Sequence, residues 1–68
     1  MTFEDYIAES EATFRNYGGW RRGQTYFNVL YQIKPALANE IRGGSLDPFY
    51  LDERVGDFLS YIMGKWDE

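Results

Sequence analysis

The chain has 68 residues and contains neither cysteine nor histidine, so disulfide bonds and the usual zinc sites cannot hold it together. A domain of this size buries only ~60% of the surface that its unfolded chain would expose, and its core supplies ~3–5 kcal/mol of net stability. Aromatic bulk remains as the source of stability, because Phe, Tyr and Trp make up 19% of the residues. The sequence therefore predicts one small domain, residues 1–68, with an aromatic core and some rings left at the surface.

Apolar residues recur with a helical period, and no segment alternates with a period of two. The pattern predicts an all-α domain of three main helices and one or two short helical turns. The main helices are expected at residues 3–16, from between Arg22 and Gln24 to Lys34, and at residues 53–66. A short helix is expected at residues 35–42.

Helix ends can be assigned from capping residues. Thr2 suits the N-cap of the first helix, and Gly18 suits a left-handed C-cap. Pro35 cannot continue the second helix but fits the first position of the short one. Asp47 before Pro48 indicates the start of a single helical turn.

Two apolar stripes define the faces expected to point inward. The first helix carries Phe3, Tyr6, Ile7, Phe14 and Tyr17, and the last carries Val55, Phe58, Leu59, Ile62, Met63 and Trp66. Asp52 is expected to cap the last helix, and Gly56 and Gly64 to allow another helix to approach closely. Glu11 and Arg15 lie four residues apart and are expected to pair.

The net charge is −4 and the isoelectric point is about 4.6, which disfavours non-specific attraction to nucleic acid or to anionic membranes. The acidic start MTFEDYIAESE is unlike a signal peptide, and no apolar run approaches the ~20 residues that span a bilayer. We therefore expect a soluble, cytoplasmic protein with no membrane contact.

Residues 18–31, GGWRRGQTYFNVLY, concentrate the residue types that carry most of the energy at contact surfaces. Trp20 is a candidate anchor for a partner, and Arg21 and Arg22 are candidate contacts to anionic groups. In the alternative interpretation Trp20 folds back as a staple ahead of the second helix, and the two arginines are merely solvated.

A polar strip follows on the second helix, where Gln24, Asn28 and Tyr31 fall at i, i+4 and i+7. These side chains are candidate hydrogen-bonding residues for a partner. Equally, they could form an internal network that ties this helix to residues 46–52, which requires every buried amide to be satisfied.

Signals for chemistry are weak. Four carboxylates gather near the last helix: Asp47, Asp52, Glu53 and Asp57. Their spacing does not match a calcium loop, so neither a metal nor another cofactor is predicted. The serines have no histidine to activate them, and no phosphate-binding glycine loop is present. We expect a protein that is not an enzyme.

Residues 20–59 resemble a family of small uncharacterised proteins from bacteriophage and prophage genomes. The motifs are Arg-Gly-Gln-x-Tyr-Phe-Asn-x-Leu-Tyr at 22–31, Leu-Ala-Asn-x-Ile-Arg-Gly at 37–43 and Leu-Asp-Pro-Phe-Tyr at 46–50. The resemblance implies a phage-encoded protein in the cytoplasm of a bacterial host. Small phage proteins without catalytic residues often bind a host protein, including components of antiviral defence.

We therefore expect a small binding protein that docks on a host protein and modulates it, with an inhibitor of antiviral defence as one form of that role. A nucleic-acid-binding accessory protein is the alternative, and it requires affinity that falls steeply with salt. A third interpretation is a structural or assembly subunit that self-associates, and a homodimer through an aromatic helix face would be its simplest form. The acidic faces also permit mimicry of nucleic acid.

Overall fold

Helix α1, Phe3–Tyr17, is bounded by the two caps expected from the sequence. The Thr2 hydroxyl accepts a hydrogen bond from the Asp5 N–H at 3.0 Å, and the Asp5 carboxylate accepts one from the Thr2 N–H at 3.1 Å. This reciprocal capping box satisfies two N–H groups that the helix cannot pair internally. At the other end Gly18 adopts a left-handed conformation, φ 71°, that glycine tolerates without strain.

Helices α2, Arg22–Ile33, and α3, Pro35–Ile41, are separated by a single residue, Lys34. Pro35 has no N–H to donate and takes the first position of α3, as predicted. After α3 the chain turns through Gly43, which has a φ of 77°.

The segment from residue 42 to residue 51, which we call the connector, differs from prediction. Asp47 and Pro48 do not start a helical turn; residues 48–51 form a β-turn closed by a hydrogen bond from the Leu51 N–H to the Pro48 carbonyl at 3.2 Å. The Asp47 carboxylate instead accepts hydrogen bonds from the N–H groups of Gly43, at 2.7 Å, and Phe49, at 2.9 Å. Asp47 therefore shapes the connector rather than capping a helix.

The last helix also begins differently from prediction. A 3₁₀ turn, η1, spans Asp52–Arg54 and leads into α4, Val55–Lys65. Asp52 does not cap α4, because its carboxylate accepts a hydrogen bond from the Gly23 N–H at 2.9 Å. The carboxylate thus supports the N-terminus of α2, where a helix has unpaired N–H groups.

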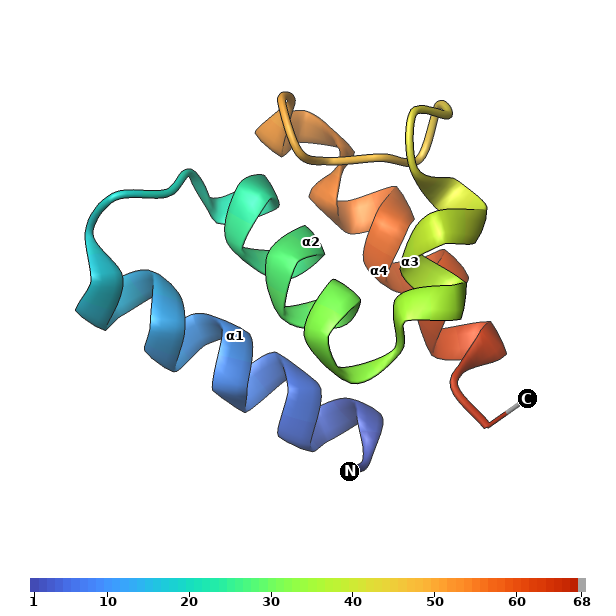
Figure 1. Ribbon diagram of the computed structural model, residues 1–68, viewed down its shortest axis with the longest axis horizontal. Coiled ribbons are helices and arrows are strands. Elements are labelled where there is room, and N and C mark those ends of the chain that lie inside the picture. Colours follow the sequence, from blue (N-terminus) through green and yellow to red (C-terminus); the bar gives the residue numbers. More distant parts are fainter. Residues whose placement is uncertain (68) are drawn as a thin grey trace.

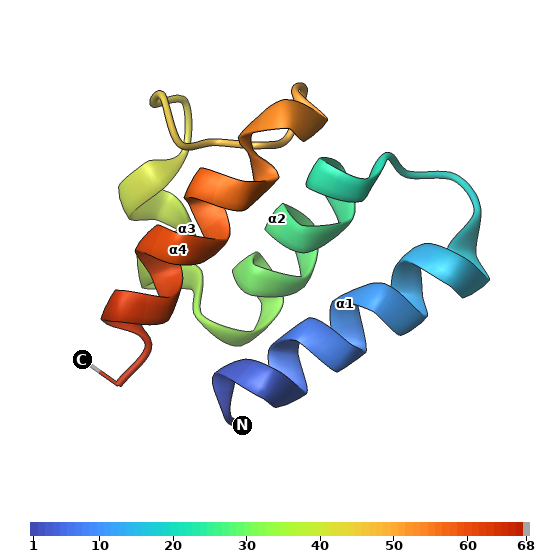
Figure 2. The same cartoon turned by 180° about the vertical axis from the view of Figure 1, so that it is seen from behind.

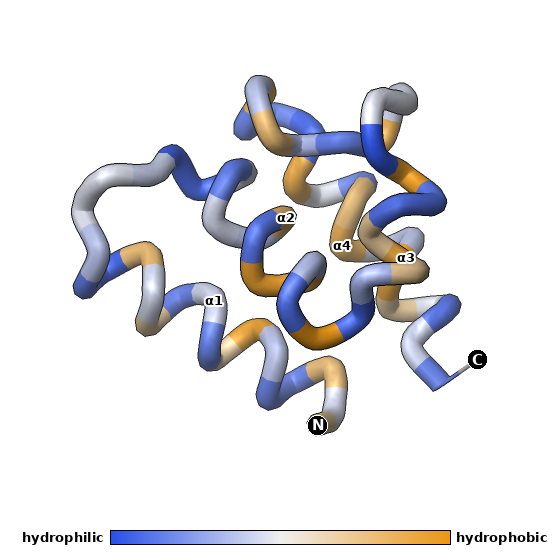
Figure 3. The backbone as a smooth tube through the Cα atoms, viewed as in Figure 1, coloured by the Kyte–Doolittle hydropathy of each residue, from blue (hydrophilic) through white to orange (hydrophobic). Residues whose placement is uncertain are grey.

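The computed structural model describes residues 1–67 as a single small all-α domain (Figure 1). In both views α2 lies between α1 on one side and α3 with α4 on the other (Figures 1 and 2). Apolar segments recur along each helix with hydrophilic segments between them (Figure 3), as the helical period requires. None of the helices within residues 1–67 combines the length and the apolar character needed to cross a membrane.

The core joins all four α-helices. Ten apolar residues are buried: Tyr6, Tyr26, Phe27, Val29, Leu30, Ala38, Ile41, Phe58, Ile62 and Trp66. The buried Tyr6 hydroxyl donates to the Tyr26 carbonyl at 2.6 Å, and burial raises the pKa of this phenol well above its ordinary value. The Trp66 ring lies 5.1 Å from the Tyr6 ring, and its N–H donates to the Met1 carbonyl at 3.1 Å. Trp66 thereby fixes the end of α4 to the start of α1.

Several side chains expected to point inward do not. Tyr17 is 60% exposed and Met63 is 58% exposed, so each apolar stripe is shorter than its pattern predicts. A Cβ built at Gly56 or at Gly64 meets nothing within 4 Å, so no helix among the described residues packs against either glycine. The expected approach of a second helix at these two positions is therefore wrong within this domain.

Candidate binding surface

The six residues predicted to contact a partner lie in two groups. Four share one outward face at the start and along the length of α2: Arg21, Gln24, Asn28 and Tyr31. The other two, Trp20 and Arg22, contact α1. The predicted site is therefore divided, and its two halves carry different contacts.

Trp20 lies in the loop between α1 and α2 and is half-buried. Its ring centroid is 4.5 Å from that of Tyr17, the last residue of α1. The alternative interpretation, in which Trp20 is a staple ahead of α2, is correct in part. Trp20 does fold back, but its ring packs on the preceding helix, α1.

Arg22 links α2 to α1 through Glu11. Its guanidinium forms a salt bridge with the Glu11 carboxylate and lies 4.6 Å from the centroid of the Phe14 ring. The Tyr26 hydroxyl donates to the same carboxylate, and burial together with this bond raises the pKa of Tyr26 to about 12. The predicted pair between Glu11 and Arg15 is wrong, because Glu11 turns toward α2 instead.

Arg21 attaches the connector to the start of α2. Its guanidinium donates to the Phe49 carbonyl at 2.6 Å and lies 5.8 Å from the centroid of the Tyr50 ring. The predicted network of Gln24, Asn28 and Tyr31 to residues 46–52 is therefore wrong, because the bonds to these residues come from Arg21, to Phe49, and from the Gly23 N–H, to Asp52. Gln24 serves the helix end instead, since its carbonyl oxygen accepts from the Arg21 N–H at 3.3 Å.

A row of four aromatic rings runs from α2 onto the connector. Phe27 lies 6.4 Å from Tyr31 on one side and 6.0 Å from Phe49 on the other, and the rings of Phe49 and Tyr50 are 4.8 Å apart. All three pairs meet edge to face, the geometry that the ring quadrupoles favour.

An arginine lies over each end of this row. The Arg42 guanidinium is 4.8 Å from the Tyr31 centroid and 5.6 Å from the Phe27 centroid, while Arg21 covers Tyr50. We define the Arg-Tyr face as five surface residues above the buried Phe27: Arg21, Tyr31, Arg42, Phe49 and Tyr50. Tyr50 is 78% exposed and Tyr31 is 40% exposed.

The Arg-Tyr face contains a hollow of about 330 Å³. Five residues of α3's end and the connector line it: Arg42, Gly43, Asp47, Phe49 and Tyr50. Both oxygens of the Asp47 carboxylate accept backbone N–H bonds. The Arg42 guanidinium makes no hydrogen bond or ion pair with any residue of the described chain, and it lies over two aromatic rings. The hollow therefore combines a guanidinium without an ion-pair partner, a carboxylate bonded to backbone N–H groups, and aromatic walls.

Sequence reasoning missed three residues of this face: Arg42, Phe49 and Tyr50. A signal was available, because two adjacent rings on an Asp-Pro turn have little chance of both reaching the core. Arg42 carried no such signal. Its position over Tyr31 depends on the angle between α2 and α3, which no local pattern encodes.

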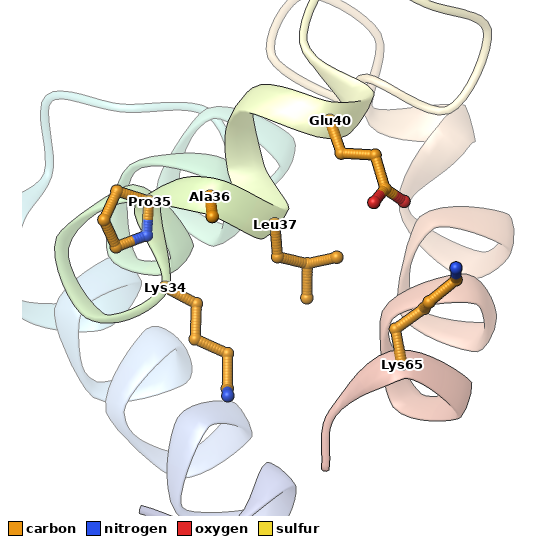
Figure 4. Close-up of a pocket in the computed structure, with 6 residues that line it drawn as sticks. All are labelled: Lys34, Pro35, Ala36, Leu37, Glu40 and Lys65. Carbon is orange, nitrogen blue, oxygen red and sulfur yellow. The ribbon is translucent and has the colours of Figure 1, made fainter. Parts of the chain in front are cut away.

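A second hollow of about 330 Å³ lies between α3 and the end of α4 (Figure 4). The side chains of Lys34 and Lys65 lie on opposite sides of Leu37, and those of Glu40 and Lys65 extend toward one another. Lys34 lies over the Trp66 ring at 5.0 Å, and the Glu40 carboxylate accepts a hydrogen bond from Tyr61. The lining of this second hollow thus contains two lysines and one glutamate.

No protein family model, curated protein or solved structure matches this chain. Among residues 1–67 no three acidic side chains gather closely enough to hold a metal ion. The strongest functional signal is therefore the Arg-Tyr face.

Proposed function

We propose that this chain is a small non-enzymatic binding protein that docks on another protein through the Arg-Tyr face. The observation that carries the proposal is Tyr50, a large ring left 78% exposed in a domain that needs its aromatic residues for the core. Tyrosine and arginine are also the residue types enriched among the energetically dominant positions of protein interfaces. The Arg-Tyr face contains two of each, and Arg42 and Tyr50 line its hollow.

The connector presents this face in one fixed shape, which favours binding. Arg54 donates to the carbonyls of Gly44, at 3.2 Å, and Asp47, at 3.3 Å. Together with the Asp47 and Arg21 bonds, these contacts fix the loop from both sides. A loop ordered before binding loses less conformational entropy when the partner arrives.

The resemblance of residues 20–59 to bacteriophage and prophage proteins supports a partner from a bacterial host. On this proposal the protein acts in the host cytoplasm and modulates the protein it binds, for which inhibition of antiviral defence is one candidate role. The Trp20–Tyr17 pair and the Arg22–Glu11 bridge lie on the α1 side of α2, and we assign them to the stability of the domain rather than to the partner.

A pull-down from nuclease-treated bacterial lysate tests this assignment, with the bound proteins identified by mass spectrometry. Tyr50→Ala removes the most exposed ring of the face and should abolish retention of the partner. Met63→Ala is the matched control, because Met63 is 58% exposed and lies on α4, outside the face; this variant should retain the partner. Equal retention by both variants would refute the assignment of the face.

A nucleic-acid-binding role has one observation in its favour, since an exposed tyrosine beside an arginine can stack on an unpaired base. Gel-shift measurements with single-stranded DNA and RNA at 50 and 200 mM salt separate the two roles. A partner protein held with little salt dependence supports docking, whereas nucleic-acid affinity that falls steeply with salt would support this alternative.

A further inference from the structure

Both arginines of the Arg-Tyr face lack an acidic partner within the described chain. The Arg42 guanidinium lies over Tyr31 and Phe27 and has no hydrogen bond or ion pair among residues 1–67. Arg21 donates to a neutral carbonyl, that of Phe49. A guanidinium that lies over the face of a ring keeps its N–H groups directed outward in its own plane. There a carboxylate can accept two of them at once.

The carboxylates near the face are already occupied. Asp47 accepts from two backbone N–H groups, and Asp52 accepts from the Gly23 N–H. Asp47 keeps its negative charge and lines the same hollow as Arg42, so the two guanidinium groups of the face against this one carboxylate leave a local excess of one positive charge on a chain whose net charge is −4. Opposite charge attracts a partner to such a surface and orients it before contact.

The hollow beside Arg42 is small and has an aromatic wall. Its volume of about 330 Å³ has room for one large side chain, and it lies at the lower end of the ~300–1,000 Å³ typical of small-molecule sites. Phe49 and Tyr50 form its aromatic wall, and Arg42 lies at its rim. An apolar side chain entering here would displace water from the rings while acidic neighbours reach the guanidinium groups.

We propose that the Arg-Tyr face takes an acidic segment of the partner protein, with carboxylates on Arg42 and Arg21 and an apolar side chain in the hollow beside Arg42. This inference rests on the proposed docking function and names the chemistry of the partner. A nucleic acid fits less well, because its charge continues at about one phosphate per 1.7 Å of duplex. Beyond the two arginines such a polyanion would meet the acidic remainder of the chain.

A labelled peptide tests the inference without knowledge of the partner. The probe is a fluorescein-labelled peptide with two glutamates on each side of a central phenylalanine, and binding is measured by fluorescence polarisation at 50 mM salt. The matched peptide replaces every glutamate with glutamine. The glutamate peptide should bind and the glutamine peptide should bind at least ~10-fold more weakly, since each charge-assisted pair is about twice as strong as a neutral one.

Two variants with the same loss of charge locate the site. Arg42→Ala should weaken binding of the glutamate peptide ~10-fold, the loss expected when one bidentate charged contact is removed. Arg15→Ala is the control, because Arg15 is an exposed arginine on α1 outside the face; it should change affinity less than ~2-fold, as a screened surface charge does. Circular dichroism of both variants establishes that the helices are intact.

Several results would overturn the inference: no binding of the glutamate peptide, equal losses from the two variants, or displacement of the peptide by a single-stranded oligonucleotide at lower concentration than by unlabelled peptide. The last result would make nucleic acid the occupant. A peptide that fails while Tyr50→Ala still loses the partner from lysate would refute the acidic segment alone and leave the docking function in place.

Discussion

Replacing Gly23 with alanine is the sharpest test of how the connector is attached to α2. Gly23 is buried in the first turn of α2, and a Cβ built on it lies 2.2 Å from the Pro48 carbonyl oxygen and 3.0 Å from an Asp52 carboxylate oxygen. The first contact involves backbone, which cannot rotate away as the end of a side chain can. The connector must therefore move for alanine to fit, and the hydrogen bond from the Gly23 N–H to Asp52 must lengthen or break.

The magnitude follows from three opposing effects. Alanine favours a helix by up to ~1 kcal/mol over glycine, whereas overpacking costs ~1–3 kcal/mol and a lost bond to a charged group ~1.5–3 kcal/mol, so the net loss is about 2–5 kcal/mol. A domain of this size has ~3–5 kcal/mol of net stability in total. We expect Gly23→Ala to unfold a large fraction of the protein at 25 °C.

The assay is urea and thermal unfolding followed by circular dichroism at 222 nm. Gly56→Ala and Gly64→Ala are matched controls, because their Cβ atoms would meet open space; each should stabilise the fold by ~0.4–1 kcal/mol. Replacing glycine with alanine thus changes the free energy of unfolding in opposite directions at different helix positions. Placing Gly23→Ala in the doubly stabilised background keeps its transition measurable, and a variant as stable as that background would refute the close contact with Pro48.

Three further substitutions test the interior. Ser10→Ala removes a buried hydroxyl that makes no hydrogen bond of ordinary geometry, although it interacts with the Tyr6 hydroxyl closely enough to lower the pKa of that phenol, which burial raises. The substitution should raise the free energy of unfolding by about 1 kcal/mol in urea titrations, and a loss would show that the contact with Tyr6 is a stabilising hydrogen bond. The pKa of Tyr26 is raised from 10.0 to about 12. The stability that this shift contributes is present below pH 10 and is lost as pH rises through 12. Tyr26→Phe should therefore flatten the fall in melting temperature over that range. Trp66→Ala should cost ~3–5 kcal/mol and abolish the cooperative transition seen by near-ultraviolet circular dichroism, whereas a retained transition would show that the contact with Met1 is dispensable.

Helix positions were predictable because their signals are local. Thr2, Gly18 and Pro35 act through their own backbone geometry and the nearest turn, and the structure has each of them in the predicted role. Asp47 and Asp52 were assigned as caps by the same reasoning, but each finds a better partner elsewhere. For Asp52 that partner, the Gly23 N–H, is 29 residues away in the sequence.

The binding surface was only half predictable for the same reason. Tyr31 and Arg21 are recognisable from their residue types, and Tyr31 also from the polar strip that it shares with Gln24 and Asn28. Arg42 and Tyr50 join them only because α3 and the connector fold back against α2. Whether Arg22 faced a partner or Glu11 was likewise decided by how α1 packs on α2, which the charges alone do not determine.

The way the connector is held has an evolutionary consequence. Its shape depends on hydrogen bonds to backbone groups from Arg21, Asp47 and Arg54, and no such bond involves the side chain of Tyr50 or Arg42. Those two residues can therefore be exchanged over many generations while the scaffold keeps its shape. Proteins that share this domain can therefore adapt to a changing partner by substituting residues at the edge of the hollow. Such substitutions cause little of the loss of folding stability that usually limits adaptation.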